Sequence, residues 1–191
     1  PNITVVEARI TDCNGAARGK WLPIAKLSSL LTEGIKLPKS AIAQDAWGRD
    51  VPSIALDNGD IDGWCQAIPG SLKPVLGSHG VDQAQVVLTM FKDNGSPLLS
   101  DPRQVLAYVT QALDAKGLYP RVAIELEFNL FDRQTAGQSI RDALPKAHQT
   151  GGNLYGLTAL DEHQALLEAL REYFDTQNLP YEGVLKEAAP A

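Results

Sequence analysis

Two glutamates, Glu125 and Glu127, interrupt one of the most apolar stretches of the chain, residues 121–132. In a β-strand successive side chains point to opposite faces, so the apolar residues would line one face and both carboxylates the other, about 6.6–6.8 Å apart. Two more glutamates, Glu182 and Glu187, lie in a second predicted strand over residues 181–187. Carboxylate oxygens suit Mg²⁺ or Mn²⁺, so Glu125, Glu127 and Glu187 form a candidate hard-cation site.

Two other interpretations of the glutamates stay open at this point. The pair could be the solvent-facing polar edge of a half-buried strand, which the residues support about as well as metal binding. A glycosidase acid and base pair would come from different strands and would need an aromatic-rich sugar cleft, which an aromatic content of 6% does not favour. No Walker-type glycine-rich loop is present, so an ATP site would have to depend on metal.

An acidic loop, residues 57–63, contains three aspartates, as the start of a calcium loop does. It lacks the regular ligand spacing and terminal glutamate of an EF-hand, so a turn of solvated acids is favoured. Cys13 and Cys65 show no Cys-x-x-Cys spacing and are expected to be reduced thiols. The three histidines are far apart, and we expect them on the surface.

The composition excludes several classes of protein. The 191 residues are 44% hydrophobic and carry a formal charge of −6, without a lysine and arginine run that would follow a nucleic-acid backbone. No stretch of 18 apolar residues and no secretion signal is present. The expectation is a soluble, cytoplasmic protein that binds neither nucleic acid nor a membrane.

Local patterns predict an α+β chain with a boundary near residue 97. Residues 1–97 are β-rich and residues 98–191 begin a second unit with helices and strands. Strands are predicted at 2–12, 16–22, 121–132 and 181–187, and short apolar runs at 52–56, 64–68 and 84–91 also fit strands. Helices are predicted at 23–33, 101–117 and 161–177. Asp101 and Asp161 are the predicted N-caps of the last two helices. The final predicted strand would leave an open sheet edge, so the chain is expected to be a fragment.

Five motifs occur in order along nearly the whole chain. They are Asp12-x-x-Gly15-x-x-Arg18-Gly19-Lys20, Asp57-x6-Trp64, Asp101-Pro102-Arg103, Glu125-Leu126-Glu127-Phe128 and Gly183-x3-Glu187-x2-Pro190. Each motif is weak alone, but the ordered set resembles the glutamine synthetase family, and is most similar to the γ-glutamylputrescine synthetase-like branch.

The resemblance implies a β-grasp N-terminal domain, then the first part of a catalytic domain with a curved antiparallel sheet, in a ring of subunits whose active sites lie between neighbours. It implies a ligase that phosphorylates glutamate with ATP to γ-glutamyl phosphate, which ammonia or an amine then attacks. By position, Glu125 would bind one Mg²⁺ or Mn²⁺ ion, Glu127 and Glu187 the other, and Glu182 would lie near the nucleotide. Asp57 would reach the neighbouring subunit's site and help to deprotonate ammonium.

Some positions depart from the family pattern. Ser71 stands where ammonia-using members have an acidic residue, and residues 73–80 replace a proline-rich segment, which fits a bulkier amine acceptor. Glu182 and Glu187 are five apart, so a bulge or strand end would be needed for both to face one site. The family's Gly-Gln-x-Glu segment would begin after Ala191, so this chain alone is expected to be inactive. The alternative is a catalytically dead homologue that acts as an assembly or regulatory module.

Overall fold

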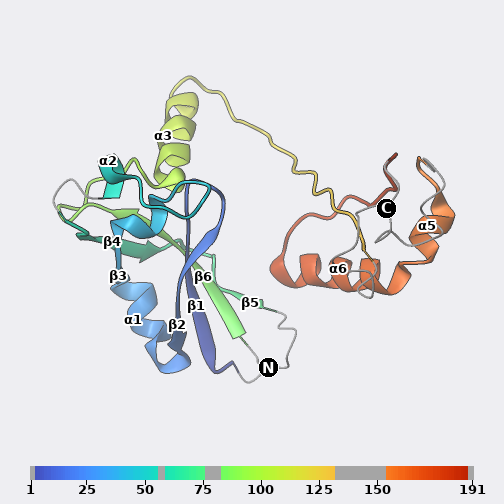
Figure 1. Cartoon of the computed structure of the whole chain (residues 1–191), viewed down its shortest axis with the longest axis horizontal. Helices are drawn as coiled ribbons and strands as arrows, with labels where there is room; N and C mark the ends of the chain where they lie inside the picture. Colours follow the sequence, from blue (N-terminus) through green and yellow to red (C-terminus); the bar gives the residue numbers. More distant parts are fainter. Residues whose placement is uncertain (1–2, 56–58, 76–82, 132–153, 189–191) are drawn as a thin grey trace. The chain divides into compact units, whose positions relative to one another are not determined.

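The computed structural model describes residues 3–55, 59–75, 83–131 and 154–188. The chain divides into two compact units, Pro1–Arg121 and Val122–Ala191 (Figure 1). The domain boundary after residue 97 stays a prediction. None of the described helices is long and apolar enough to cross a membrane.

The first unit is built on a mixed sheet of six strands in the order β2-β1-β6-β4-β3, with β5 also paired to β6. β1 and β6 are parallel, and every other pair is antiparallel. Lys20 Nζ on one edge strand donates to Lys36 O on the other at 3.4 Å, so the sheet is nearly closed. The strands are β1 (Val5–Thr11), β2 (Ala17–Pro23), β3 (Ile35–Pro38), β4 (Asp62–Ala67), β5 (Lys73–Val75) and β6 (Gln83–Phe91).

The core of this unit lies on one face of the sheet. Alternate residues of β1 and β6 are buried there, because successive side chains of a strand point to opposite faces. The buried cluster includes Val6, Ala8, Ile10, Val86, Leu88 and Met90 from these two strands, together with Leu30, Leu37, Ile42 and Cys65. The predicted hairpin and the predicted strand at 84–91 are therefore confirmed.

Short helices connect the strands. They are η1 (Ile24–Lys26), α1 (Leu27–Thr32), η2 (Lys39–Ile42) and α2 (Pro52–Ala55). The first two together confirm the helix predicted at 23–33. The apolar run predicted as a strand at 52–56 instead begins with helix α2, because Pro52 can open a helical turn and lacks the N–H that a ladder needs. β3 and β5 were not predicted.

The longest helix of this unit is α3 (Pro102–Asp114), which begins where its cap residue predicts. The buried Asp101 carboxylate accepts hydrogen bonds from Arg103 N at 2.8 Å, Met90 N at 2.6 Å and Thr89 Oγ1 at 2.9 Å. One carboxylate therefore caps the helix and fixes its start to the end of β6.

The second unit contains α5 (Leu157–Asp161) and α6 (Gln164–Gln177) in its described part. Asp161 ends α5 and does not cap α6, so its predicted role is wrong, because an extra helical turn precedes the predicted start. Asn178 ends α6 in the left-handed conformation, as its position predicts. The chain then turns back, and the ring of Tyr181 lies 5.5 Å from that of Phe174, edge to face.

In the described residues, the segments predicted as strands at 121–132 and 181–187 form no strand, because neither pairs with any described strand. A β-strand takes its backbone hydrogen bonds from a neighbour, so an alternating pattern without a partner cannot form a ladder. The irregular path of residues 181–187 also removes the need for a bulge between Glu182 and Glu187. The apolar residues that should line one face of the first segment, Val122, Ile124, Leu126 and Phe128, are 84, 81, 72 and 57% exposed.

Candidate functional site

The predicted metal ligands all belong to the second unit. Glu125 and Glu127 lie on the extended segment after Arg121, and both are exposed. Glu182 and Glu187 are also exposed and lie in the segment that follows α6. Across the described ranges, no three histidine, cysteine, aspartate or glutamate side chains come together in a way that could hold a metal ion. The carboxylates are available to solvent, but the structure does not assemble them.

One contact connects the Glu187 segment to a distant part of the same unit. Tyr155 N donates to Lys186 O at 2.8 Å, and Lys186 Nζ donates to Glu187 O at 2.7 Å. Tyr155 has a φ of 58°, in the left-handed region that non-glycine residues seldom occupy. Strained residues of this kind cluster at functional sites, so Tyr155 is a further candidate, and one that a sequence pattern does not reveal.

Asp57 lies outside the described residues. Three residues after it, Asp60 accepts hydrogen bonds from Ser40 N at 3.3 Å and Ser40 Oγ at 3.0 Å. The next carbonyl, Ile61 O, accepts a hydrogen bond from Lys39 N at 3.2 Å. Asp60 therefore binds the backbone of η2, as expected for a turn aspartate. This part of the acidic loop fits the turn interpretation that the sequence favours over calcium.

Ser71 occupies the position that departs from ammonia-using members. Its hydroxyl accepts from Val87 N at 3.1 Å and donates to Val87 O at 3.2 Å, so it exchanges hydrogen bonds with β6 much as a strand residue would. Its N–H donates to Ile68 O at 3.1 Å. The side chain thus holds the turn between β4 and β5 onto β6.

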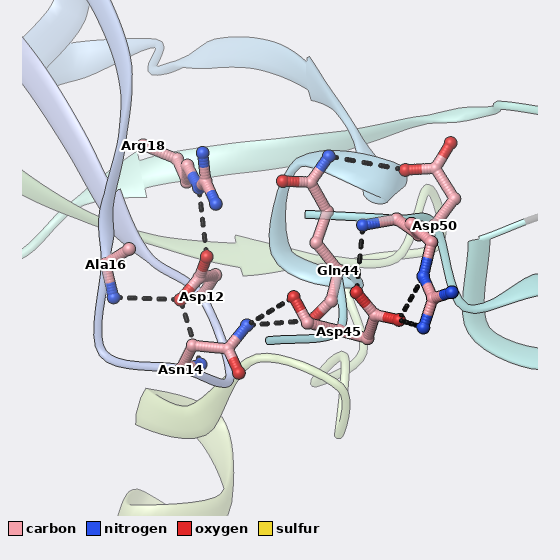
Figure 2. Close-up of polar contacts among 8 residues, drawn as sticks. Asp12, Asn14, Ala16, Arg18, Gln44, Asp45 and Asp50 are labelled. Atoms are coloured by element: carbon pink, nitrogen blue, oxygen red, sulfur yellow. Dashed lines mark hydrogen bonds and ion pairs between the residues drawn. The ribbon is translucent and has the colours of Figure 1, made fainter. Parts of the chain in front are cut away.

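A buried polar site of the first unit surrounds Asp12, at the turn between β1 and β2 (Figure 2). Its side chain is fully buried. Oδ1 accepts from Asn14 N at 2.9 Å and Ala16 N at 2.8 Å, while Oδ2 accepts from Arg18 Nε at 2.9 Å. Burial alone would raise the pKa of Asp12, but the hydrogen bonds from Ala16, Arg18 and Asn14 outweigh it and hold the pKa below its ordinary value.

Asn14 joins this turn to a second, distant loop. Its Nδ2 donates to Gln44 O at 2.8 Å and to Asp45 O at 3.2 Å, and Figure 2 shows both hydrogen bonds as dashed lines. Asp45 repeats the pattern of Asp12: Oδ1 accepts from Trp47 N at 2.8 Å and Arg49 N at 3.0 Å, and Oδ2 accepts from Arg49 Nε at 2.8 Å. Hydrogen bonds from Arg49 and Trp47 lower the pKa of Asp45, because together they outweigh the desolvation that would raise it.

With this geometry in view, comparisons with known proteins identify the family. The model for the glutamine synthetase catalytic domain matches residues 99–191. Over its whole length the chain is 34% identical, across 197 aligned residues, to gamma-glutamylputrescine synthetase PuuA of Escherichia coli (strain K12). The chain belongs to the glutamine synthetase family. It spans 41% of the length of that curated relative.

Solved structures agree with this glutamine synthetase family fold. The structure described as a GmaS/ADP complex matches with a TM-score of 0.70 and 18% identity, over 91% of this chain and 36% of that one. A structure described as a novel glutamine synthase homolog matches with a TM-score of 0.69 and 16% identity, over 98% of this chain and 42% of that one. At these identities the likeness concerns the fold alone.

The five ordered motifs led to the correct family, although they have different functions in the structure. The Asp12 motif supplies a buried network, and the Asp101 motif supplies a helix cap. The roles of Asp57, Glu125, Glu127, Glu182 and Glu187 stay predictions. The contacts of Asn14 and the strained Tyr155 could not be found by pattern, because each depends on a partner about thirty residues away.

Proposed function

We propose that the whole protein is an ATP-dependent ligase that joins the γ-carboxyl of glutamate to an amine or ammonia through γ-glutamyl phosphate. The similarity to gamma-glutamylputrescine synthetase PuuA along this entire chain is the observation that carries the proposal. The acceptor class that we favour is a diamine or polyamine, in line with the name of that relative.

The carboxylates have roles in this proposal according to their positions in the motifs. Glu125 would bind one Mg²⁺ or Mn²⁺ ion, Glu127 and Glu187 the other, and Glu182 would lie near ATP. Acidic oxygens are the donors that these ions prefer, so the donor set fits, and all four glutamates are exposed. When bound, such ions supply neutralisation of the phosphate charge during phosphoryl transfer. The segments that carry the glutamates must draw together before they can act.

Ser71 supports an acceptor larger than ammonia. An acid at this position could bind ammonium, but the Ser71 hydroxyl is uncharged and already bonded to the Val87 backbone. A site without that charge would bind ammonium less well, which fits a bulkier amine as acceptor. Asp57 would help to position and deprotonate the attacking nitrogen in a neighbouring subunit's site.

The finer fold is also part of the proposal. Residues 1–97 would form a β-grasp domain and residues 98–191 the first part of the catalytic domain, in which the extended segment after Arg121 would join a curved antiparallel sheet. Four exposed apolar side chains there support this, since burying each one would stabilise the protein by about 1.5–3 kcal/mol. The whole protein would form a cytoplasmic ring of identical subunits.

The direct test uses the full-length protein with glutamate and ATP, and measures ADP release with ammonia, putrescine, spermidine and ethanolamine in turn. Release that requires both glutamate and an amine is expected, with putrescine or spermidine preferred. Glu125→Gln, Glu127→Gln and Glu187→Gln should each lower kcat by about 10²-fold or more. Glu172→Gln, on the exposed face of α6, is the matched control and should change nothing. No turnover with any acceptor would remove the ligase proposal.

The second candidate is a catalytically dead homologue that serves as an assembly or regulatory module. The absence of a three-ligand metal group in the described part of the chain favours it. Calorimetry on the full-length protein separates the two candidates. An active ligase should bind Mg²⁺ or Mn²⁺, and binding should weaken in the three glutamine variants, whereas a dead homologue should show no binding.

A further inference from the structure

Two Asn-Gly turns of the first unit share one backbone conformation. In each, the N–H of the first residue donates to the carbonyl of the fifth, at 3.0 Å in residues 12–16 and 2.9 Å in residues 92–96. The glycine N–H donates to the first residue's carbonyl, at 3.1 and 2.8 Å respectively. Gly15 and Gly95 have φ values of 80° and 77°. A difference in reactivity between Asn14 and Asn94 must therefore come from the surroundings of their side chains.

Those surroundings are opposite, although both asparagines are exposed. At Asn94 the amide oxygen is bound: Oδ1 accepts from Ser96 N at 3.1 Å and from Ser96 Oγ at 2.7 Å. At Asn14 the amide nitrogen is bound: Nδ2 donates to Gln44 O and Asp45 O. One turn thus polarises the amide carbonyl, and the other holds the amide nitrogen.

We propose that Asn94 is a site of spontaneous deamidation and isoaspartate formation, and that Asn14 is protected from the same reaction. The Gly95 N–H first releases Lys92 O, and the Gly95 nitrogen then loses its proton to solvent and attacks Cγ of Asn94. The Cγ–Nδ2 bond breaks, and the amide nitrogen takes up a proton from solvent and leaves as ammonia. Water then opens the succinimide. Cleavage at the Cγ–N bond gives aspartate, and cleavage at the main-chain carbonyl gives isoaspartate. The net reaction consumes one water and needs no other reactant.

The hydrogen bonds act on opposite steps of this reaction. Negative charge develops on Oδ1 as Gly95 attacks, and the two donors of Ser96 stabilise it as the donors of an oxyanion hole do. At Asn14 the departing nitrogen would have to break two hydrogen bonds. The carboxylate formed there would also face two carbonyl oxygens, which repel it. Succinimide formation is therefore assisted at residue 94 and opposed at residue 14.

Deamidation would change the connection between β6 and α3. It adds a negative charge next to Asp93, and isoaspartate inserts an extra methylene into the main chain of the turn. A cavity of about 460 Å³ lies beside this turn, lined by Asp93 with Glu33, Lys36 and Trp64 among others. The rim of that cavity would become more acidic as the protein ages.

The test is incubation of the chain at mildly alkaline pH, followed by peptide mass spectrometry and an isoaspartate assay. We expect conversion at Asn94 to be about tenfold or more faster than at Asn14. The two hydrogen bonds to Oδ1 of Asn94 assist the reaction, whereas the two from Nδ2 of Asn14 oppose it. Ser96→Ala should slow Asn94 by about 3- to 10-fold, and Ser96→Thr, which keeps a hydroxyl, should restore most of the rate.

Peptides with Asn14 serve as the internal control in every sample. Equal rates at both asparagines, faster conversion at Asn14, or an unchanged rate in Ser96→Ala would overturn the proposal. Circular dichroism of each variant before incubation shows whether the fold is intact, and conversion in urea should become equal at the two sites because both turns are then lost. Asn58-Gly59 lies partly outside the described residues and is followed as a separate peptide.

Discussion

Two substitutions of Asp12 separate the contribution of its ion pair from that of its backbone hydrogen bonds. Asp12→Asn keeps an oxygen at Oδ1 for the N–H groups of Asn14 and Ala16, but it places an NH₂ group against Arg18 Nε, donor facing donor. Asp12→Ala removes every acceptor. The loss of stability in Asp12→Asn therefore measures the ion pair with Arg18. The additional loss in Asp12→Ala measures the two backbone hydrogen bonds from Asn14 and Ala16.

The magnitudes follow from burial. Arg18 is 38% exposed, so solvent screens the ion pair, and we expect Asp12→Asn to cost about 1–2 kcal/mol. Asp12→Ala also leaves the N–H of half-buried Ala16 without its acceptor, and Asn14 N loses a charge-assisted bond. The total should be about 3–4 kcal/mol, close to the cost of breaking a buried pair.

Urea unfolding measured by tryptophan fluorescence is the assay, because all three tryptophans, Trp21, Trp47 and Trp64, lie in the first unit. The midpoint should fall in the order wild type, Asp12→Asn, Asp12→Ala, with an unchanged slope. Asp45→Asn is the matched control, since Asp45 makes the same pattern of bonds on an exposed loop and should shift the midpoint less.

The pH dependence gives an independent check. The pKa of Asp12 is lowered in the folded state, so its stabilising effect is present above the ordinary aspartate pKa and is lost as pH falls through the folded value. Asp12→Asn should show less acid destabilisation than wild type. The reasoning is refuted if the two variants have the same midpoint, or if both lie within about 0.5 kcal/mol of wild type.

Three further predictions concern single sites. Burial raises the pKa of Cys65 to about 12, so a thiol reagent at pH near 8 should label only Cys13 in the folded chain and both cysteines in urea. Ser71→Ala should lower stability in urea by about 1 kcal/mol, while Ser71→Thr, which keeps the hydroxyl, should lower it less; equal losses would show that the bonds to Val87 contribute nothing. Tyr155→Gly should relieve backbone strain yet reduce ligase activity of the full-length protein if the side chain serves the site, and unchanged kcat and KM would limit Tyr155 to a structural role.

The sequence predicted the helices and strands whose ends are determined by nearby turn and cap residues. The β1–β2 hairpin follows from its Asn14-Gly15 turn, and α3 begins at the Asp101 cap with Pro102 as its first residue. β3 and β5 have only four and three residues and exist because longer strands pair with them, so no window of sequence could reveal them. The segment after Arg121 is the opposite case, because its sequence alternates as a strand does but no described strand pairs with it.

The Asp12 motif and the glutamate motifs carry different kinds of information about function. Arg18 pairs with Asp12, a Cβ at Gly19 would lie 1.8 Å from Ala8 O, and Lys20 reaches across the sheet to Lys36. The fold itself therefore accounts for Asp12, Arg18 and Gly19, whether or not the protein is an enzyme.

An active ligase and a dead homologue would therefore share the Asp12 motif and could not be told apart by it. Glu125, Glu127 and Glu187 are exposed, and the described structure gives them no structural task. A dead homologue could lose these glutamates without cost to the fold, whereas an active ligase could not lose them and keep its activity. Substitution of the three glutamates, and not of the buried site around Asp12, must therefore separate the two proposals.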